Sequence, residues 1–310
     1  MEIPKEYMAD FYSATLEILN TCPLCDARDF SFFLQAPDFL VTRQEFQIVK
    51  CQNCNLLFTN PRPTEETIGL YYESQEYISH SNTQASLLAK LYQVVRKYTI
   101  RQKANLIRQK ISSPTHLLDV GCGTGEFLSF MEKKGWIVTG IEPSEKARRY
   151  AQKYYRLNIF EPSYLFDLPE KSYEVITLWH VLEHLHRVNE YLERLKKLLK
   201  PDGFLILALP NSQAAEARYY GSYWAAYDLP RHLYHFSPST LQHLLKKHRI
   251  QVLEKKRMLF DAFYVALLSE RYQDHALAYL RAFGCGFWSN LIALMNIDRC
   301  SSLIYICSSQ

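Results

Sequence analysis

Several common features are missing from this chain of 310 residues, and each absence excludes a class of protein. No run of about 20 apolar residues occurs, so we expect no membrane-spanning helix. The start, Met1–Tyr7, is polar and partly acidic, unlike a secretory signal peptide. The net charge of +4 permits a nucleic-acid partner but is too small to argue for one. Internal repeats and low-complexity tracts are absent too, which leaves an ordinary globular chain.

The cysteines do not form a disulfide set of the secreted kind. Four of the eight make two C-x-x-C pairs, Cys22 with Cys25 and Cys51 with Cys54, and the other four are scattered. A reduced, cytoplasmic setting is the simpler interpretation. Each pair can direct two thiolates at one ion, so the four cysteines predict a closed zinc site that stabilises a small module and takes no part in chemistry. An iron centre of the same geometry, or four reduced thiols in a small core, are the alternatives.

Apolar and aromatic residues, in contrast, are plentiful, at 48% and 14%. These proportions are typical of a globular protein, and the length allows one large domain and a small one. Between residues 116 and 209, apolar runs alternate with helical patterns. This alternation predicts a parallel sheet with right-handed crossovers.

The most informative stretch is Asp119-Val-Gly-Cys-Gly-Thr-Gly125, between a predicted strand at 116–120 and a predicted helix at 125–134. Its glycines allow a tight turn and close approach to a ligand, and the helix start behind them favours a nucleotide-like cofactor. The G-x-G-x-G spacing differs from the G-x-G-x-x-G of dinucleotide sites. Asp119 precedes the glycines, and Glu142 ends the next apolar run. Two such acids suit a ligand with a cationic end and a ribose diol, such as S-adenosylmethionine (SAM).

On these residues the chain resembles the class I SAM-dependent methyltransferases. The resemblance covers roughly residues 106–254. The four motifs that carry it, in order, are Asp119–Gly125, Gly140-Ile-Glu-Pro-Ser144, Tyr173–His184 and Lys200-Pro-Asp-Gly203. It implies an α/β fold with a Rossmann-like, seven-stranded, mostly parallel sheet flanked by helices, whose last two strands form a reverse hairpin. Some methyltransferases of sugar and polysaccharide pathways are similar in also having an N-terminal zinc-binding module, which helps to cover or form the substrate site.

We predict three parts of the chain: a zinc-binding module at 1–63, a helical linker or cap at 64–111, and a methyltransferase domain at 112–310. A helical insertion at about 258–297 precedes the last strand. Residues 1–20 are expected to be a loose lead-in or a helix, and Thr64 is expected to begin a helix. The helical pattern at 84–111 has a basic face that we interpret as solvated. That face consists of Arg96, Lys97, Arg101 and Lys103.

The resemblance also implies which residues hold SAM. Glu142 is expected on the ribose hydroxyls, and Cys122 is expected to act through its backbone N–H and not as a nucleophile. Many relatives have an acid for the adenine where this chain has Tyr164, so Leu165 and Phe166 are expected to sandwich the ring. The full predicted set is Asp119, Gly121, Cys122, Gly123, Gly125, Glu142, Pro143, Leu165, Phe166, Trp179 and His180.

Methyl transfer requires an aligned acceptor and, for a hydroxyl or protonated amine, a base. Histidine is the usual base near neutral pH. His232 is the favoured choice, and the other candidates are His180, His184 and His235. The segment 222–236 is rich in aromatic residues, as expected of a loop around a polar organic substrate. Its predicted substrate contacts are Tyr223, Trp224, Tyr227, Arg231 and His232.

The alternatives for these residues are structural. Arg231 and His232 could instead orient the next helix, whose expected N-cap is Ser237, and His180 and His184 could contact the cofactor or pack. Asp261, after a strand predicted near 250–257, could face the substrate.

The leading functional hypothesis is a SAM-dependent methyltransferase of a small molecule, with a sugar or sugar-linked metabolite as a candidate acceptor. An RNA methyltransferase with a zinc module is the second, but the charges between the cysteine pairs nearly cancel. The Asn/Asp-Pro-Pro-aromatic tetrad of many base N-methyltransferases is also absent. A SAM-binding scaffold without activity is the third hypothesis.

Overall fold

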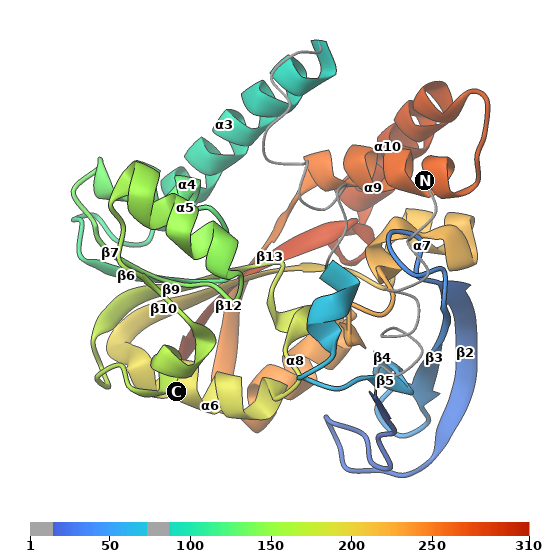
Figure 1. Ribbon diagram of the computed structural model, residues 1–310, viewed down its shortest axis with the longest axis horizontal. Coiled ribbons are helices and arrows are strands. Elements are labelled where there is room, and N and C mark those ends of the chain that lie inside the picture. The colour runs from blue at the N-terminus through green and yellow to red at the C-terminus, as the bar shows by residue number, and fades with distance from the viewer. Residues whose placement is uncertain (1–14, 73–86, 310) are drawn as a thin grey trace.

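The computed structural model describes residues 15–72 and 87–309, and the statements below refer to these residues. The lead-in or helix was predicted over residues 1–20; residues 1–14 lie outside the described part, and strand β1 (Leu16–Glu17) lies in the remainder in place of a helix. The predicted helix start at 84–86 also lies outside the described residues. Figure 1 shows a large layered α/β part and, beside it, a smaller sheet that contains the early strands.

Seven strands form the main sheet, in the order β12-β13-β10-β9-β6-β7-β8. Neighbours from β10 to β8 run parallel, whereas β13 is antiparallel to both β10 and β12. The prediction of a mostly parallel sheet that ends in a reverse hairpin is confirmed. The strands are β6 (His116–Val120), β7 (Ile137–Ile141), β8 (Ile159–Phe160), β9 (Tyr173–Trp179), β10 (Leu199–Pro210), β12 (Ile250–Arg257) and β13 (Ser302–Ser309).

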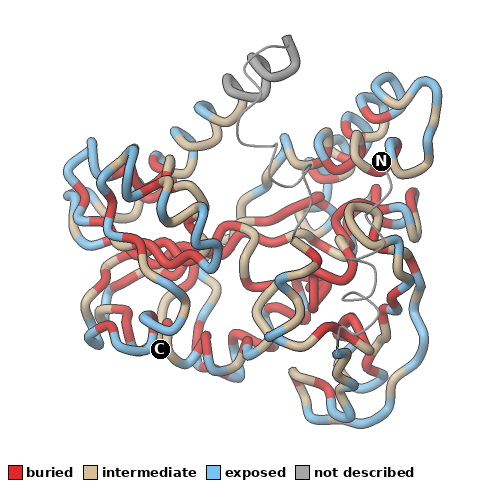
Figure 2. Tube along the Cα trace, viewed as in Figure 1, coloured by how far each residue is buried: buried red, intermediate tan, exposed pale blue. Residues whose placement is uncertain are grey.

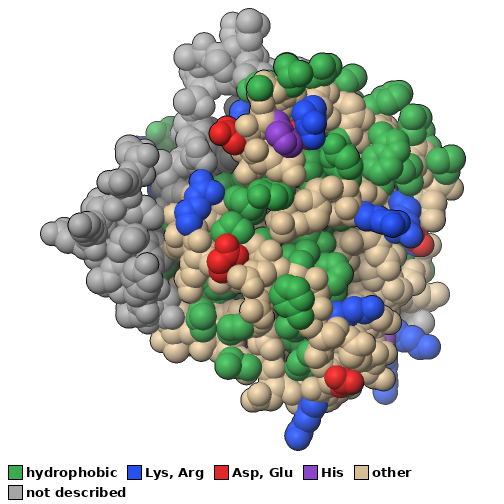
Figure 3. All heavy atoms as spheres, turned by 90° about the vertical axis from the view of Figure 1, so that its right-hand side faces the viewer, with side chains coloured by type: hydrophobic (Ala, Val, Ile, Leu, Met, Phe, Trp, Pro, Cys, Tyr) green, Lys and Arg blue, Asp and Glu red, His purple; other side chains and the backbone are tan. Residues whose placement is uncertain are grey.

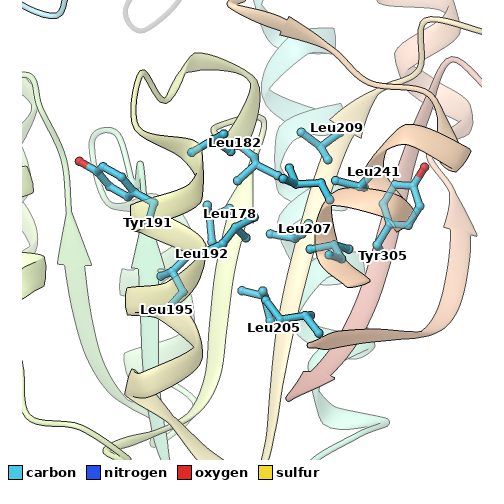
Figure 4. Packing of buried hydrophobic residues seen from close by; sticks show 14 of the residues in the cluster. Leu178, Leu182, Tyr191, Leu192, Leu195, Leu205, Leu207, Leu209, Leu241 and Tyr305 are labelled. Carbon is cyan, nitrogen blue, oxygen red and sulfur yellow. The ribbon is translucent and has the colours of Figure 1, made fainter. Parts of the chain in front are cut away.

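Helices cover both faces of this sheet (Figure 1). Consecutive strand residues point to opposite faces, so Leu117 packs in the core beneath α3, α4 and α5, while Leu118 belongs to the core beneath α6 and α8. Figure 4 shows Leu192 and Leu195 of α6 directed at the leucines of the sheet. The helices are α3 (Leu87–Arg108), α4 (Glu126–Glu132), α5 (Glu145–Tyr155), α6 (Val188–Leu198) and α8 (Pro238–Lys247). Helix α8 has Ser237 as its N-cap, as expected.

The smaller sheet contains four strands in the order β11-β4-β3-β2. Three come from the predicted module, namely β2 (Phe30–Pro37), β3 (Glu45–Cys51) and β4 (Leu57–Thr59), but β11 (Tyr234–His235) comes from the methyltransferase part. A further pair joins β1 (Leu16–Glu17) to β5 (Arg62–Pro63). The predicted boundary at residue 63 is therefore crossed by backbone hydrogen bonds, and the core runs through both parts.

The predicted helix at Thr64 is wrong in type. The carbonyl of Thr64 accepts hydrogen bonds from the backbone of Thr67 and Ile68, which makes a turn, and only the short 3-10 helix η1 (Ile68–Tyr72) follows. Five further 3-10 helices link the larger elements: η2 (Pro162–Phe166), η3 (Leu182–His184), η4 (Gly221–Tyr223), η5 (Ala225–Tyr227) and η6 (Ile297–Arg299).

The predicted insertion between β12 and β13 consists of α9 (Leu259–Tyr272) and α10 (Ala278–Met295), with α7 (Ala215–Tyr220) beside α10. Figure 2 shows a buried central sheet and a mostly exposed α10. The side of the molecule seen in Figure 3 carries many hydrophobic side chains with arginines and lysines among them. Several large apolar residues of α10 are exposed, among them Leu280, Phe283, Phe287 and Leu294. None of the described helices combines the length and apolar character needed to cross a membrane.

Candidate active site

The glycine-rich loop connects the end of β6 to the start of α4 and has a backbone that only glycine adopts easily. Gly121, Gly123 and Gly125 all have positive φ angles, of 74°, 56° and 82°. A Cβ atom on Gly121 would meet Val181 Cγ2 at 2.3 Å, and one on Gly125 would meet Leu157 Cδ1 at 2.8 Å. A Cβ on Gly123 would meet nothing within 4 Å, so open space adjoins this part of the loop.

Glu142 lies directly after β7 and holds the neighbouring backbone in place. One of its carboxylate oxygens accepts a hydrogen bond from the N–H of Gly123 at 2.8 Å, and the other accepts from Ser144 at 2.9 Å. Burial raises the pKa of this carboxyl, while these two bonds act to lower it. A carboxylate fixed beside open space suits the two hydroxyls of a ribose.

Asp119 is buried at the end of β6, where it accepts a 2.6 Å hydrogen bond from the Thr177 hydroxyl of β9. Burial raises its pKa to about 7, although Thr177 and the charge of Lys103 work in the opposite direction. Lys103 was predicted on a solvated helix face, and for this residue the prediction is wrong. Its ammonium lies 4.3 Å from the ring centroid of Trp179, and burial lowers its pKa to about 8.

The residues predicted to surround the adenine differ in how far their side chains are exposed. Leu165 is wholly buried in the core, so its side chain cannot contact a ligand. Phe166 and Tyr164 are each partly exposed, and Tyr164 stacks on Phe160 with 4.0 Å between ring centroids. Pro143 is exposed. The exposed rings of Tyr164 and Phe166 are therefore available to a flat ligand ring, whereas the side chain of Leu165 is not.

The four cysteines of the two C-x-x-C pairs come together at one point. The Sγ atoms of Cys22 and Cys54 lie 3.5 Å apart, those of Cys25 and Cys51 lie 3.6 Å apart, and all four lie within 4.8 Å of one another. Four thiolates about 2.3 Å from one ion would be separated by roughly 3.8 Å in an ideal tetrahedron, so the set fits a tetrahedral metal. Each pair is followed by a residue of positive φ, Asp26 and Asn55, that closes a tight turn.

A cavity of about 650 Å³ lies beside the carboxyl ends of β9 and β10. Its walls come from the β2–β3 loop, the segment 225–232 and α9, so the small sheet and the helical insertion both help to enclose it. Lining residues include Phe39, Arg43, His180, Pro210, Asp228, His232, Asp261, Tyr264, Leu268, Arg271 and Tyr272. The volume is typical of a pocket for a small organic molecule.

Of the four histidines predicted as candidates for the base, His180 and His232 line this cavity. His180, at the end of β9, has a φ of 57° and lies between two carboxylates, 3.5 Å from Glu183 and 3.3 Å from Asp261. Burial alone would lower its pKa, but these two partners outweigh it and raise the pKa to about 9. The weakly predicted Asp261 therefore lies at the site.

The other two histidines do not line the cavity. His184 lies behind His232, with ring centroids 4.6 Å apart, and burial lowers its pKa to about 4. His235 belongs to β11 in the small sheet, where its Nε2 lies 3.2 Å from the hydroxyl of Thr59, and burial lowers its pKa well below the usual value. Their positions favour structural roles over proton transfer with a substrate.

Three of the five predicted substrate contacts are buried within the segment 222–236 and do not line the 650 Å³ cavity, namely Trp224, Tyr227 and Arg231. Trp224 and Tyr227 are buried against each other, and the guanidinium of Arg231 is enclosed by Asp38 and Asp228. Tyr223 is partly exposed and contacts Phe39, which does line the cavity. Arg231 therefore has a structural role, but its partners are Asp38, Asp228 and the carbonyl of Tyr71, and not the helix after Ser237 that the structural alternative named.

Several lining residues carried no signal that sequence reasoning could use. Phe39 and Arg43 come from a turn between two strands of the module, and Tyr264, Leu268 and Arg271 come from α9. The insertion was recognised as apolar and helical, but its lining face could only be identified once α9 was placed against the segment 225–232.

The sheet order, the glycine loop and the carboxylate after β7 together define a class I SAM-dependent methyltransferase. A protein-family model described as a methyltransferase domain matches residues 92–255, more than half of the chain, and the chain belongs to this family.

Curated relatives are similar over part of the chain. The ubiquinone biosynthesis O-methyltransferase of Rickettsia bellii (strain OSU 85-389) is 28% identical over 177 residues, which cover 51% of this chain and 73% of the relative. That of Rickettsia typhi is 27% identical over 202 residues, covering 60% and 81%.

Solved structures share the fold. A putative sarcosine dimethylglycine methyltransferase from Galdieria sulphuraria matches with a TM-score of 0.52 and 11% identity over 71% of this chain and 88% of that one. The [4+2]-cyclase SpnF matches with a TM-score of 0.51 and 16% identity over 80% and 98%. Because a cyclase has the same fold, the fold alone does not fix the reaction.

A pH dependence of SAM binding follows from Asp119. If Asp119 is a cofactor residue, as the sequence predicts, its carboxylate form should attract the cationic cofactor, and that form is lost as the pH falls through about 7. We therefore expect the wild type to lose SAM affinity relative to Asp119→Asn as the pH falls below 7, by up to about tenfold per pH unit. Calorimetry between pH 5.5 and 8.5 on the wild type and on Asp119→Asn measures this, because the difference between the two profiles removes the titration of SAM itself. Parallel profiles would contradict the prediction.

Proposed function

We propose that this methyltransferase transfers the methyl group of SAM to a hydroxyl oxygen of a small molecule that occupies the 650 Å³ cavity. The observation that carries the proposal is the position of β9. Its Thr177 holds Asp119 on the cofactor side, and three residues later His180 lines the cavity. The methyl donor and the acceptor would therefore meet at the end of one strand. The relatives described as O-methyltransferases support an oxygen acceptor.

When bound, SAM supplies a methyl group on a positively charged sulfur, which needs no further activation. The chain's own contribution is to hold and orient the two partners. Glu142 and the loop glycines are proposed to hold the nucleoside, and Trp179 and Lys103 are proposed to hold the amino-acid end. The indole N–H of Trp179 is buried without a partner among the described residues, so a ligand could accept its hydrogen bond.

The cavity walls also indicate what kind of acceptor fits. Phe39 and Tyr272 stack with 4.3 Å between ring centroids, and Tyr264 adds a third aromatic ring. Arg43 and Arg271 add positive charge. An acceptor with one apolar or ring-shaped face and a polar or anionic part matches this lining, and a sugar-linked metabolite remains within that description.

Two measurements test the proposal. With ³H-methyl SAM and a cell extract as the acceptor source, label should appear in the low-molecular-weight fraction and not in RNA or protein. With ¹³C-methyl SAM, the chemical shift of the product methyl should be that of a methoxy group. Label confined to macromolecules, or a methyl on nitrogen or carbon, would overturn the assignment.

We also propose that the four-cysteine cluster holds a structural zinc ion. All four ligand positions are thiols, so no open position is left for a water or a substrate. Cys22 and Cys51 belong to the same core as the main sheet, so loss of the ion should disturb more than the module.

Cys51→Ser should therefore lose zinc and lower Tm by more than roughly 4 °C. Metal analysis and thermal unfolding measure the two effects. Cys285→Ser, a partly buried thiol outside the cluster, is the control and should keep its zinc. Equal zinc content in both variants would contradict the proposal.

A further inference from the structure

Three side chains beside the cavity form a second cluster with the character of a metal site. Glu183 and His184 lie in η3, and His232 comes from the segment after β10; one ligand atom from each lies within 4.8 Å of the others. Glu183 and His232 are buried, and His184 is partly so. None of the three belongs to the four-cysteine cluster.

The hydrogen bonds of both histidines leave a lone pair for a metal. Nδ1 of His232 lies 2.8 Å from the carbonyl oxygen of Ala226, and Nδ1 of His184 lies 3.0 Å from that of Arg231. A carbonyl oxygen can only accept, so Nδ1 of His232 carries the proton and its Nε2 presents a lone pair. Nδ1 of His184 also lies 2.9 Å from the hydroxyl of Tyr72. When this Nδ1 donates to the carbonyl of Arg231, Nε2 of His184 presents a lone pair as well. Metal-binding histidines in proteins are oriented by the same kind of contact.

Glu183 supplies the charge that a cation would balance. Its side chain is 1% exposed, and in the described part of the chain no group donates a hydrogen bond to either of its oxygens. The nearest cationic group is Nδ1 of His180, 3.5 Å from Oε1. This ion pair offsets part of the cost of burying the Glu183 carboxylate, and a metal cation bound to the carboxylate would lower that cost further.

From this geometry we propose that Glu183, His184 and His232 bind a divalent transition-metal ion that in turn binds the acceptor hydroxyl. Two imidazoles and one carboxylate favour manganese, iron, cobalt, nickel or zinc over magnesium and calcium. Three protein ligands leave coordination positions open. Because His232 lines the cavity, an acceptor bound there would lie next to the metal.

The role of the ion rests on the proposed function. A hydroxyl bound to a divalent metal loses its proton more easily, and that proton passes to water at the cavity mouth. The oxygen then forms its bond to the methyl carbon as the bond between carbon and sulfur breaks, and the sulfonium becomes a neutral thioether. In this account His232 holds the metal and is not itself the base.

Metal binding is tested on the full chain without SAM or acceptor, so its outcome is independent of the proposed function. After metal analysis has established the zinc content of the cysteine cluster, MnCl₂ is titrated and followed by electron paramagnetic resonance. The wild type should bind Mn²⁺ in addition to that zinc. Glu183→Gln and His232→Gln should weaken Mn²⁺ binding by at least about tenfold. His248→Gln removes a buried histidine that bonds Glu193 and Asn189, away from the cluster, and should bind as the wild type does.

Cobalt gives a second readout that does not depend on the stability of any variant. Co²⁺ in the cysteine cluster absorbs strongly through its sulfur ligands, whereas Co²⁺ bound by two imidazoles and a carboxylate shows only weak bands. The wild type should show the weak bands after the cysteine cluster is filled. Absence of Mn²⁺ binding and of the weak cobalt bands would overturn the metal site. Methyl transfer that persists with the metal removed would overturn its role while leaving the proposed function intact.

Discussion

Glu142→Ala should weaken SAM binding by about 100-fold or more. The carboxylate fixes two backbone N–H groups of the cofactor site, and its oxygens are the expected acceptors for the ribose hydroxyls. A hydrogen bond to a charged group contributes about 1.5–3 kcal/mol, so losing two costs about 3–6 kcal/mol, and each 1.4 kcal/mol is about tenfold in affinity. Isothermal titration calorimetry measures the effect directly.

Glu145→Ala is the matched control for this substitution. Glu145 lies three residues further along, is exposed and forms an ion pair with the exposed Arg149. SAM affinity should stay within about twofold of the wild type there, since exposed pairs contribute little. If Glu142→Ala is folded and binds SAM as the control does, Glu142 is not a cofactor ligand.

Substitutions at two glycines of the cofactor loop distinguish a loss of SAM binding from a loss of stability. A side chain at Gly123 would extend into open space, so Gly123→Val should remain folded at a modest strain cost and block the cofactor. A side chain at Gly121 would collide with Val181, so Gly121→Val should lower stability first. The two variants should thus fail for different reasons in calorimetry and in thermal unfolding.

Arg231→Met should lower the free energy of unfolding by about 3–5 kcal/mol, because it leaves the buried carboxylate of Asp38 and the half-buried one of Asp228 without their cationic partner. Arg231 is 1% exposed and contacts Asp38 at 3.0 Å and Asp228 at 2.7 Å. It also donates a 2.8 Å hydrogen bond to the carbonyl of Tyr71. Through these contacts it ties the β2–β3 loop to the segment that carries His232. Urea unfolding followed by circular dichroism measures the change.

Arg187→Met provides the comparison. Arg187 also contacts two carboxylates, of Glu65 and Glu190, but its side chain is 49% exposed. Its substitution should cost no more than about 1 kcal/mol. If Arg231→Met were as stable as Arg187→Met but failed to bind acceptor, the sequence-based prediction of a substrate contact would be right and the structural role wrong.

Local sequence patterns were enough to predict most strands and helices of this protein and its main motifs. Apolar runs and glycines placed β6, β7 and the cofactor loop, and cysteine spacing predicted the cluster of Cys22, Cys25, Cys51 and Cys54. These features depend on neighbours in sequence, which periodicity and spacing capture directly. The seven-stranded, mostly parallel sheet with a reverse hairpin at its end was implied by the family resemblance, whereas the order of the strands came from the structure.

Contacts between distant segments could not be predicted in this way. Arg231 contacts Asp38, 193 positions earlier in the sequence. Strand β11 likewise pairs with β4, where His235 bonds Thr59 across 176 positions. The meeting of Glu183 and His184 with His232 depends on the path of the loop after β10. The aromatic composition of segment 222–236 predicted a substrate-binding loop. It could not show which of its side chains are buried in the core and which line the cavity.

The most direct test of the account is methyl transfer by a variant with a filled cavity. Leu268 lines the cavity from α9, and Leu268→Trp should reduce its volume without touching the cofactor loop. Leu280→Trp makes the same change on the exposed face of α10, where the side chain is 69% exposed. With labelled SAM and the small-molecule fraction of an extract, the wild type and Leu280→Trp should transfer label. Leu268→Trp should bind SAM normally but transfer at least about tenfold less. Equal transfer by all three proteins would contradict the assignment of this cavity as the acceptor site.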